Sequence, residues 1–103
     1  MKQVNNEMLN GLVLYVNNTR NLYENTKLVC KSLARKKRKG NYDDQKAIKA
    51  FYNLVNLALK QYYIEFGGAY AWYLLANTAT RQAVAKELLE EYIEDIEEFT
   101  KDL

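Results

Sequence analysis

The fold is decided by residues 43–66, which read DDQKAIKAFYNLVNLALKQYYIEF. Apolar residues recur there every three or four positions, which is the period of one face of an α-helix. They are Ile48, Phe51, Tyr52, Val55, Ala58, Leu59, Tyr62, Tyr63 and Phe66. Asp43 is a suitable N-cap, the helix dipole favours Asp44 in the first turn, and Gly67-Gly68 can close the helix. The stretch therefore predicts a helix from near residue 43 to residue 66.

The preceding residues, from about 5 to 39, show the same helical period. Their apolar positions are Leu9, Leu12, Val13, Val16, Leu22, Tyr23, Thr26, Val29, Cys30 and Leu33. One unbroken helix of this length would measure ~50 Å at 1.5 Å per residue. A compact domain of this size has a radius of gyration of only ~13 Å. We therefore expect a break at Asn17-Asn18-Thr19, where Asn and Thr make good N-caps.

The rest of the chain completes a helical protein. A short apolar piece at residues 70–75 is expected to be helical, and Asn77 or Thr78 is expected to cap a final helix. The apolar stripe of that helix is Val84, Ala85, Leu88, Leu89, Tyr92, Ile96 and Phe99. The chain has no proline and no sustained alternation of period two, so nothing favours a sheet. The prediction is an all-α fold, with residues 1–103 forming a single-domain bundle of three to four helices.

The composition limits the setting of the protein. Hydrophobic residues make up 49% of the 103 residues, which is enough for a core, and no apolar run approaches the ~20 residues of a transmembrane helix. The first residues lack the apolar stretch of a signal peptide. Cys30 is the one cysteine and cannot form an internal disulfide. We therefore expect a cytoplasmic protein without a membrane partner.

A basic surface is expected on the second helix. Five cations of this surface lie within a narrow sector of the helix circumference. We name them the basic stripe: Arg20, Lys27, Lys31, Arg35 and Arg38. Lys36, Lys37 and Lys39 extend this surface, and Tyr42 is the aromatic residue nearest to it. Clustered Lys and Arg can bind phosphates or an acidic protein; the alternative is a solvated helix face. Lys37 would lie on the core side of a continued helix, so we expect the run at residues 35–39 to fray or to project past the bundle.

The final helix is acidic, because residues 87–102 hold eight carboxylates against one lysine. Four of them are spaced by four, three and four residues and therefore lie on one side of the helix. We name them the acidic face: Glu87, Glu91, Glu94 and Glu98. Glu90, Asp95 and Glu97 lie beside it. The face could be solvated, could bind a basic partner, or could pair with residues 35–39 of the same chain. Metal binding has little support, since the chain has no histidine to complete a carboxylate–histidine motif.

Catalytic machinery is not evident in the sequence. Without a histidine to activate it, Cys30 is predicted to be a buried and inert thiol. No carboxylate is paired with a nucleophile or a metal motif, so we expect no enzymatic activity and no cofactor. Tyr70, Trp72 and Tyr73 cluster near the two glycines. One expectation is that these three residues pack in the core. The alternative is that they are exposed together and form a site of contact with another protein.

Short segments along most of the chain carry a resemblance. They are NNTRNLYE at 17–24, LARK at 33–36, GNYD at 40–43, KQY at 60–62 and EFG at 65–67, with Ala47, Arg81, Val84, Ala85 and Leu88. In these segments the chain resembles a group of small, helical, uncharacterised proteins encoded by tailed phages and prophages. The resemblance implies the cytoplasm of an infected bacterium as the setting.

The function expected from the residues and the resemblance together is a non-enzymatic protein-interaction module of phage or mobile-element origin. Its partner would be a host or phage protein, and the resemblance makes an inhibitor of a host defence or regulatory protein conceivable. The alternative is a nucleic-acid-binding accessory protein that uses the basic surface at residues 20–39. The oligomeric state is left open.

Overall fold

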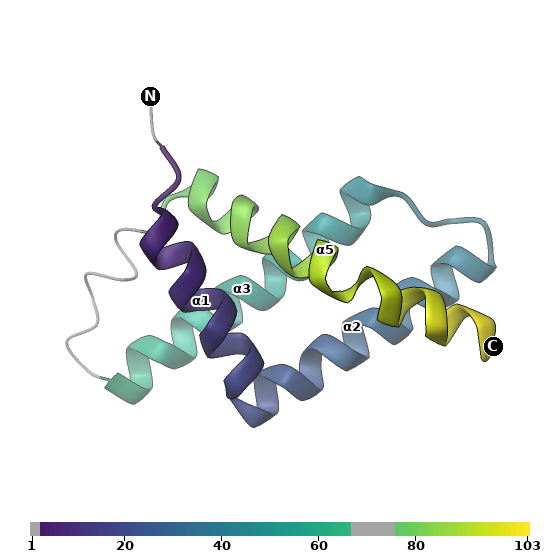
Figure 1. Cartoon of the computed structure of the whole chain (residues 1–103), viewed down its shortest axis with the longest axis horizontal. Helices are drawn as coiled ribbons and strands as arrows, with labels where there is room; N and C mark the ends of the chain where they lie inside the picture. Colours follow the sequence, from purple (N-terminus) through teal and green to yellow (C-terminus); the bar gives the residue numbers. More distant parts are fainter. Residues whose placement is uncertain (1–2, 67–75) are drawn as a thin grey trace.

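A computed structural model of the chain describes residues 3–66 and 76–103 (Figure 1). These residues form the helices α1 (Asn6–Asn18), α2 (Arg20–Arg38), α3 (Asp44–Phe66) and α5 (Thr78–Lys101). No strand occurs within the described ranges, so the prediction of an all-α bundle is confirmed. The helical piece expected at residues 70–75 lies outside the described residues.

The helix starts follow from local capping. The side chain of Asn5 accepts a hydrogen bond from the backbone N–H of Met8 (3.0 Å) and so caps α1. Asp43 accepts from the N–H of Lys46 (2.8 Å) at the start of α3, and Asn77 accepts from the N–H of Thr80 (2.8 Å) at the start of α5. Each of these bonds satisfies a donor that has no partner within its helix. The predicted starts of α3 and α5 are therefore confirmed.

The break between the first two helices falls where it was predicted, at Thr19. This residue is extended (φ −103°, ψ 114°), while Asn18 ends α1 and Arg20 begins α2. Thr19 is the N-cap residue of α2, but its side chain makes no capping hydrogen bond. One extended residue is enough to turn the chain, and α1 and α2 form a V (Figure 1).

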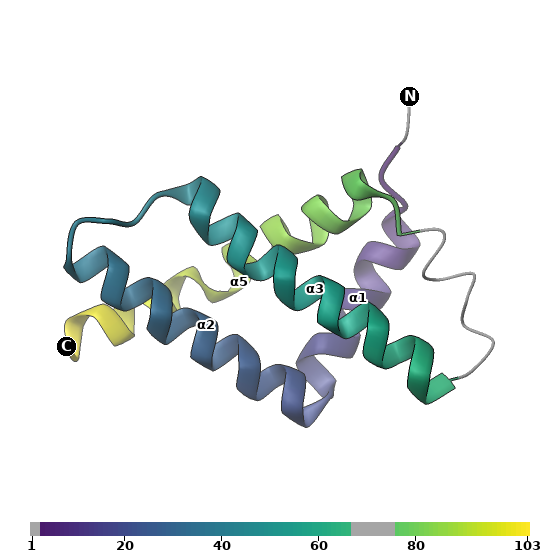
Figure 2. The same ribbon diagram turned by 180° about the vertical axis from the view of Figure 1, so that it is seen from behind.

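Helix α5 is the central element of the bundle. It crosses α3 in both views of the ribbon (Figures 1 and 2) and contacts α1, α2 and α3. The radius of gyration is 14.0 Å, close to the ~13 Å expected for a compact domain of this length. Within the described residues, none of the helices is apolar over a length that could cross a membrane.

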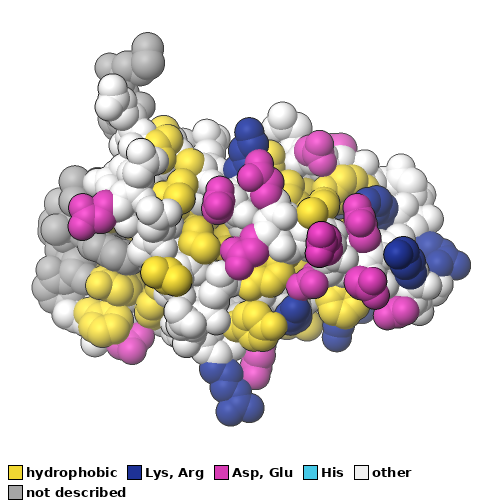
Figure 3. All heavy atoms as spheres, viewed as in Figure 1, with side chains coloured by type: hydrophobic (Ala, Val, Ile, Leu, Met, Phe, Trp, Pro, Cys, Tyr) yellow, Lys and Arg dark blue, Asp and Glu magenta, His cyan; other side chains and the backbone are white. Residues whose placement is uncertain are grey.

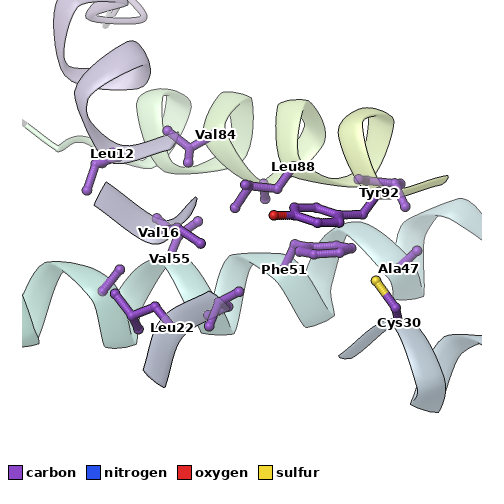
Figure 4. Close-up of a cluster of buried hydrophobic side chains, with 14 of the residues drawn as sticks. Leu12, Val16, Leu22, Cys30, Ala47, Phe51, Val55, Val84, Leu88 and Tyr92 are labelled. Carbon is purple, nitrogen blue, oxygen red and sulfur yellow. The ribbon is translucent and has the colours of Figure 1, made fainter. Parts of the chain in front are cut away.

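Hydrophobic side chains from all four helices meet in one core (Figure 4). The Phe51 ring of α3 stacks on the Tyr92 ring of α5 with centroids 6.4 Å apart. Cys30 is fully buried beside them, as predicted, and burial raises the pKa of its thiol to about 11. The remaining fully buried large residues include Leu12, Val16, Leu22, Leu33, Val55, Leu59, Val84, Leu88 and Ile96.

The start of α1 is bonded to the start of α5. The backbone N–H of Asn5 donates to the hydroxyl oxygen of Thr80 (3.0 Å), across 75 residues of sequence. In the other direction, the side-chain amide of Asn77 donates to the carbonyl oxygen of Gln3 (3.1 Å). The two contacts hold the first turn of α1 against the first turn of α5.

The apolar stripe predicted for α3 is buried only over part of its length. Tyr63 and Phe66 were expected to face the core, but they are 44% and 55% exposed. The last turns of α3 lie at the edge of the bundle (Figure 1), where the ring of Tyr15 contacts that of Phe66 (6.3 Å between centroids) without burying it. Tyr15 of α1 makes an edge-to-face contact with Tyr62 (5.1 Å between centroids). Tyr23 of α2 was also assigned to the apolar stripe and is 41% exposed.

Candidate functional site

Lys27 of the basic stripe is engaged by α5. Its ammonium group donates to Asp95 (2.7 Å) and lies over the rings of Tyr23 and Tyr92, 5.1 and 5.5 Å from the centroids. The hydrogen bond to Asp95 raises the pKa of Lys27 above its usual 10.5. The solvated interpretation is therefore wrong for Lys27, because α5 packs along this flank of α2.

The other members of the stripe divide between internal contacts and solvent. Lys31 lies over the Phe99 ring of α5 (5.5 Å), and the guanidinium of Arg38 donates to main-chain oxygens of Thr100 and Leu103. Arg20 pairs with Glu24 on its own helix (3.2 Å), where both side chains are largely exposed. Such an exposed pair contributes little to stability.

Of the two behaviours expected for the basic run, fraying or projection past the bundle, the first does not occur in α2. It stays helical through Arg38 and ends in a Schellman motif. The N–H of Gly40 donates to the carbonyl of Lys37 (3.2 Å), and the N–H of Asn41 donates to the carbonyl of Lys36 (2.8 Å). Gly40 has φ +77°, a left-handed conformation that glycine adopts without strain. This closure keeps the basic run ordered up to its last residue.

Three cations at the end of α2 remain open to solvent. Lys37 lies over the Tyr42 ring (5.3 Å), whereas Arg35, Lys36 and Lys39 are exposed and have no carboxylate within 4.0 Å among the described residues. We name Arg35, Lys36 and Lys39 the basic end. Burial raises the pKa of Tyr42, whose hydroxyl donates to Asp44 (3.2 Å). Tyr42 is thus a packing residue of the connection between α2 and α3.

The acidic face is exposed along α5. Carboxylates are spread over this side of the molecule in Figure 3, with hydrophobic side chains between them. Glu87, Glu94 and Glu98 are exposed, and no Lys or Arg lies within 4.0 Å of them in the described part of the chain. Glu91 is also exposed and accepts a hydrogen bond from the amide of Asn17 (2.9 Å). The acidic face therefore keeps most of its charge uncompensated.

Of the three alternatives for the acidic helix, pairing of its carboxylates with residues 35–39 is not found among the described residues. Within the described residues, the ion pair that joins α2 to α5 is Lys27–Asp95, about two helical turns before the basic run. Arg38 reaches the end of α5, but it contacts main-chain oxygens of Thr100 and Leu103 instead of side-chain carboxylates. The two charged blocks are thus separate surfaces of the same molecule.

A groove of about 300 Å³ borders the acidic face on the side of α3. Asp44 and Ile48 line it from α3, and the residues that line it from α5 are Lys86, Leu89, Glu90 and Ile93. The sequence placed Ile48 and Leu89 in apolar stripes but gave no sign of an opening between them. The crossing of two helices creates it, and only the angle between them could have revealed it.

The aromatic candidates Tyr70, Trp72 and Tyr73 lie outside the described residues. Comparisons of the chain with protein-family models, with curated proteins and with solved structures found no match. The chemistry of the charged faces and of the groove is therefore what indicates function.

Proposed function

We propose that the protein is a non-enzymatic interaction module that binds a basic surface of a partner protein through the acidic face of α5. The observation that carries this proposal is that Glu87, Glu94 and Glu98 are exposed without a cation among the described residues. Their carboxylates keep full access to an approaching partner.

Electrostatics supports a partner of opposite charge. Like charges three or four residues apart on a helix repel by roughly 0.2–0.5 kcal/mol per pair, and Glu94 and Glu98 stand four apart on an exposed surface. A basic partner would relieve this repulsion and would be steered toward the face during encounter. The nearby cation Lys27 does not compete for the face, because Asp95 already binds it.

The resemblance to phage and prophage proteins supplies a setting for the proposal. The partner would be a host or phage protein in the bacterial cytoplasm. By covering a surface that this partner needs, the module would act as an inhibitor of a defence or regulatory system. This part of the proposal rests on the resemblance alone.

Nucleic-acid binding through the basic end is the second candidate. It is favoured by the exposure of Arg35, Lys36 and Lys39 without a carboxylate partner within the described ranges. It is weakened by the internal engagement of Lys27 and Arg38, which reduces the number of cations available to phosphates. The acidic face would also repel a long polyanion.

A pair of matched variants separates the two candidates. Glu87→Gln/Glu94→Gln/Glu98→Gln neutralises three charges of the acidic face, and Arg35→Gln/Lys36→Gln/Lys39→Gln neutralises three of the basic end. The wild type and both variants are immobilised, exposed to bacterial lysate, and the captured proteins are identified by mass spectrometry. Affinities of the captured proteins are then measured by calorimetry with purified components. We expect basic proteins to be captured by the wild type and the basic-end variant, and to be lost from the acidic-face variant.

A nucleic-acid titration completes the experiment. If the basic end neutralised three phosphates of duplex DNA, log affinity would fall with log salt with a slope of about −2.7, from ~0.9 per phosphate. We expect negligible binding of a fluorescent duplex at ~0.15 M salt, where the screening length is ~8 Å. Binding at that salt that disappears in the basic-end variant, with no change in the acidic-face variant, would replace the first candidate by the second.

A further inference from the structure

We propose that the groove between α3 and α5 receives an apolar side chain from a basic amphipathic helix of the partner protein. The inference rests on the proposed function, and it adds the form of the partner and the place where that partner is anchored. The occupant is a helix with apolar residues on one face and Lys or Arg beside them.

The groove offers apolar contact that the protein itself does not use. Three apolar residues line it: Leu89, which is 7% exposed, and Ile48 and Ile93, which are partly buried. Its volume of about 300 Å³ is at the lower end of the range of ~300–1,000 Å³ typical of pockets that bind small molecules. An apolar side chain of a partner helix therefore fits, whereas a whole folded domain does not.

The crossing of α3 and α5 explains why the groove stays open. The two helices are in close contact where Phe51 stacks on Tyr92, and they diverge from there toward the start of α3 (Figure 1). Asp44 and Ile48 belong to that first part of α3. The groove therefore lies where the two helix backbones separate.

The charges around the groove favour a basic occupant. Asp44 and Glu90 line it, and neither has a cation within 4.0 Å among the residues that the structure describes. Glu94 follows Glu90 by one helical turn, which extends the negative rim onto the acidic face. Lys86 is the cation that lines the groove. A helix that inserts an apolar residue would therefore place flanking Lys or Arg side chains near carboxylates, as in helix-in-groove recognition.

Another copy of this chain is a different occupant that the test must distinguish. Leu28 of α2 is 61% exposed, and Lys31 and Arg35 follow it at one and two helical turns. Lys31 lies over the Phe99 ring of α5, so it is partly used within the chain. We therefore commit to a separate partner protein and treat self-association as an outcome against the proposal.

The test uses two synthetic fluorescent peptides. One is a helix-forming peptide with leucines at positions i, i+3, i+4 and i+7 and lysines at most other positions. The other has the same lysines, with glutamine in place of each leucine. Fluorescence polarisation with the wild-type protein should show the leucine peptide binding at least about tenfold tighter, since burial of one leucine favours binding by that factor or more.

Variants of the groove identify where the leucine peptide binds. Ile48→Trp fills the groove without removing apolar contact, and Ile93→Ser enlarges the groove. In each variant, the affinity for the leucine peptide should fall to the affinity for the glutamine peptide. Leu28→Ser is the matched control, since it removes an exposed apolar residue outside the groove, and it should change nothing. Circular dichroism at each step verifies that the variants are folded, and ¹⁵N NMR shifts at Ile48, Leu89 and Ile93 report occupancy directly.

The outcomes separate the groove from the acidic face. Equal affinities of the two peptides, both lost in the acidic-face variant, would overturn the groove and leave the proposed function standing. Leucine-peptide binding that is lost in Ile48→Trp but unchanged in the acidic-face variant would support the groove and overturn the proposed function. Tight binding that survives Ile48→Trp, or no binding of either peptide, would overturn the inference. Self-association that both Ile48→Trp and Leu28→Ser abolish would assign the groove to a second copy.

Discussion

The inward and outward faces of α5 meet entirely different surroundings. On the inward face, Leu88 and Ile96 are completely buried against the other helices. On the outward face, Glu87, Glu94 and Glu98 are exposed and lack a cation within the described residues. The same helix therefore stabilises the bundle with one side and presents charge with the other. The two roles can be changed separately, because residues on opposite sides of a helix share few contacts.

The flank between these faces combines both kinds of interaction. Asp95 binds Lys27 of α2 at 2.7 Å, and the two side chains are 38% and 32% exposed. Lys27 also lies over the ring of Tyr92, so its stem packs on the core while its charge is paired. Substitutions on the inward face, the flank and the outward face should thus have decreasing effects on stability.

The largest loss is expected on the inward face. Leu88→Ala removes a fully buried side chain and leaves a cavity, which typically costs about 2–5 kcal/mol of unfolding free energy. Urea unfolding followed by circular dichroism measures this loss. The remaining folded fraction should still bind a basic partner with wild-type affinity. A loss of stability below ~1 kcal/mol would mean that the inward face of α5 is not the main support of the bundle.

An intermediate loss is expected on the flank. Lys27→Met keeps most of the apolar stem but removes the ion pair with Asp95, so we expect a decrease of at most about 1 kcal/mol, because both side chains are partly solvated. The pKa of Lys27 is raised in the folded protein by the hydrogen bond to Asp95. A raised lysine pKa contributes stability that is fully present below the unfolded value of 10.5 and is lost as pH rises through the folded value. The difference between wild type and variant should therefore be constant near neutral pH and shrink above about pH 10.5.

The control for the flank is Arg20→Met. Its pair with Glu24 lies on one helix, and the two side chains are 93% and 62% exposed, so its removal should change stability little at any pH. If Arg20→Met and Lys27→Met reduced stability equally, the contacts of Lys27 with α5 would stabilise the fold no more than an exposed ion pair does.

The smallest effect is expected on the outward face, and its sign is reversed. Glu94→Gln/Glu98→Gln removes two carboxylates four residues apart, and relief of their repulsion should raise stability by roughly 0.2–0.5 kcal/mol. The gain should be greatest at low ionic strength, because salt screens exposed charges. Thermal unfolding at two salt concentrations measures it. A clear loss of stability would show that these glutamates support the fold and would weaken their assignment to a binding surface.

Local sequence signals predicted the fold well. Asp43 and Asn77 cap the helices that they were expected to cap, and the break at Thr19 was found from helix length and capping residues. These features depend on neighbours within a few residues, which the sequence shows directly. The burial of Cys30 also followed from its place in an apolar stripe.

The candidate site was predicted less completely, because it depends on which helices become neighbours. The sequence placed Lys27 and Arg35 on one stripe, but α5 covers Lys27 and leaves Arg35 exposed. The stripe of α3 included Phe66, which contacts Tyr15 of α1 but remains 55% exposed at the end of the helix. The groove beside Ile48 exists only because α3 and α5 diverge. The spacing of apolar residues does not predict the crossing angles of helices or how far one helix extends past another.

The bond between the first turns of α1 and α5 bears on the order in which the chain folds during synthesis. Asn5 and Thr80 are separated by 75 residues, so α1 cannot reach its final position until α5 has left the ribosome. Before then, α1, α2 and α3 lack the helix that all three contact. Contacts so distant in sequence slow folding, because the chain must lose loop entropy before it gains them. The nascent chain is thus exposed to chaperones and proteases until α5 has emerged from the ribosome.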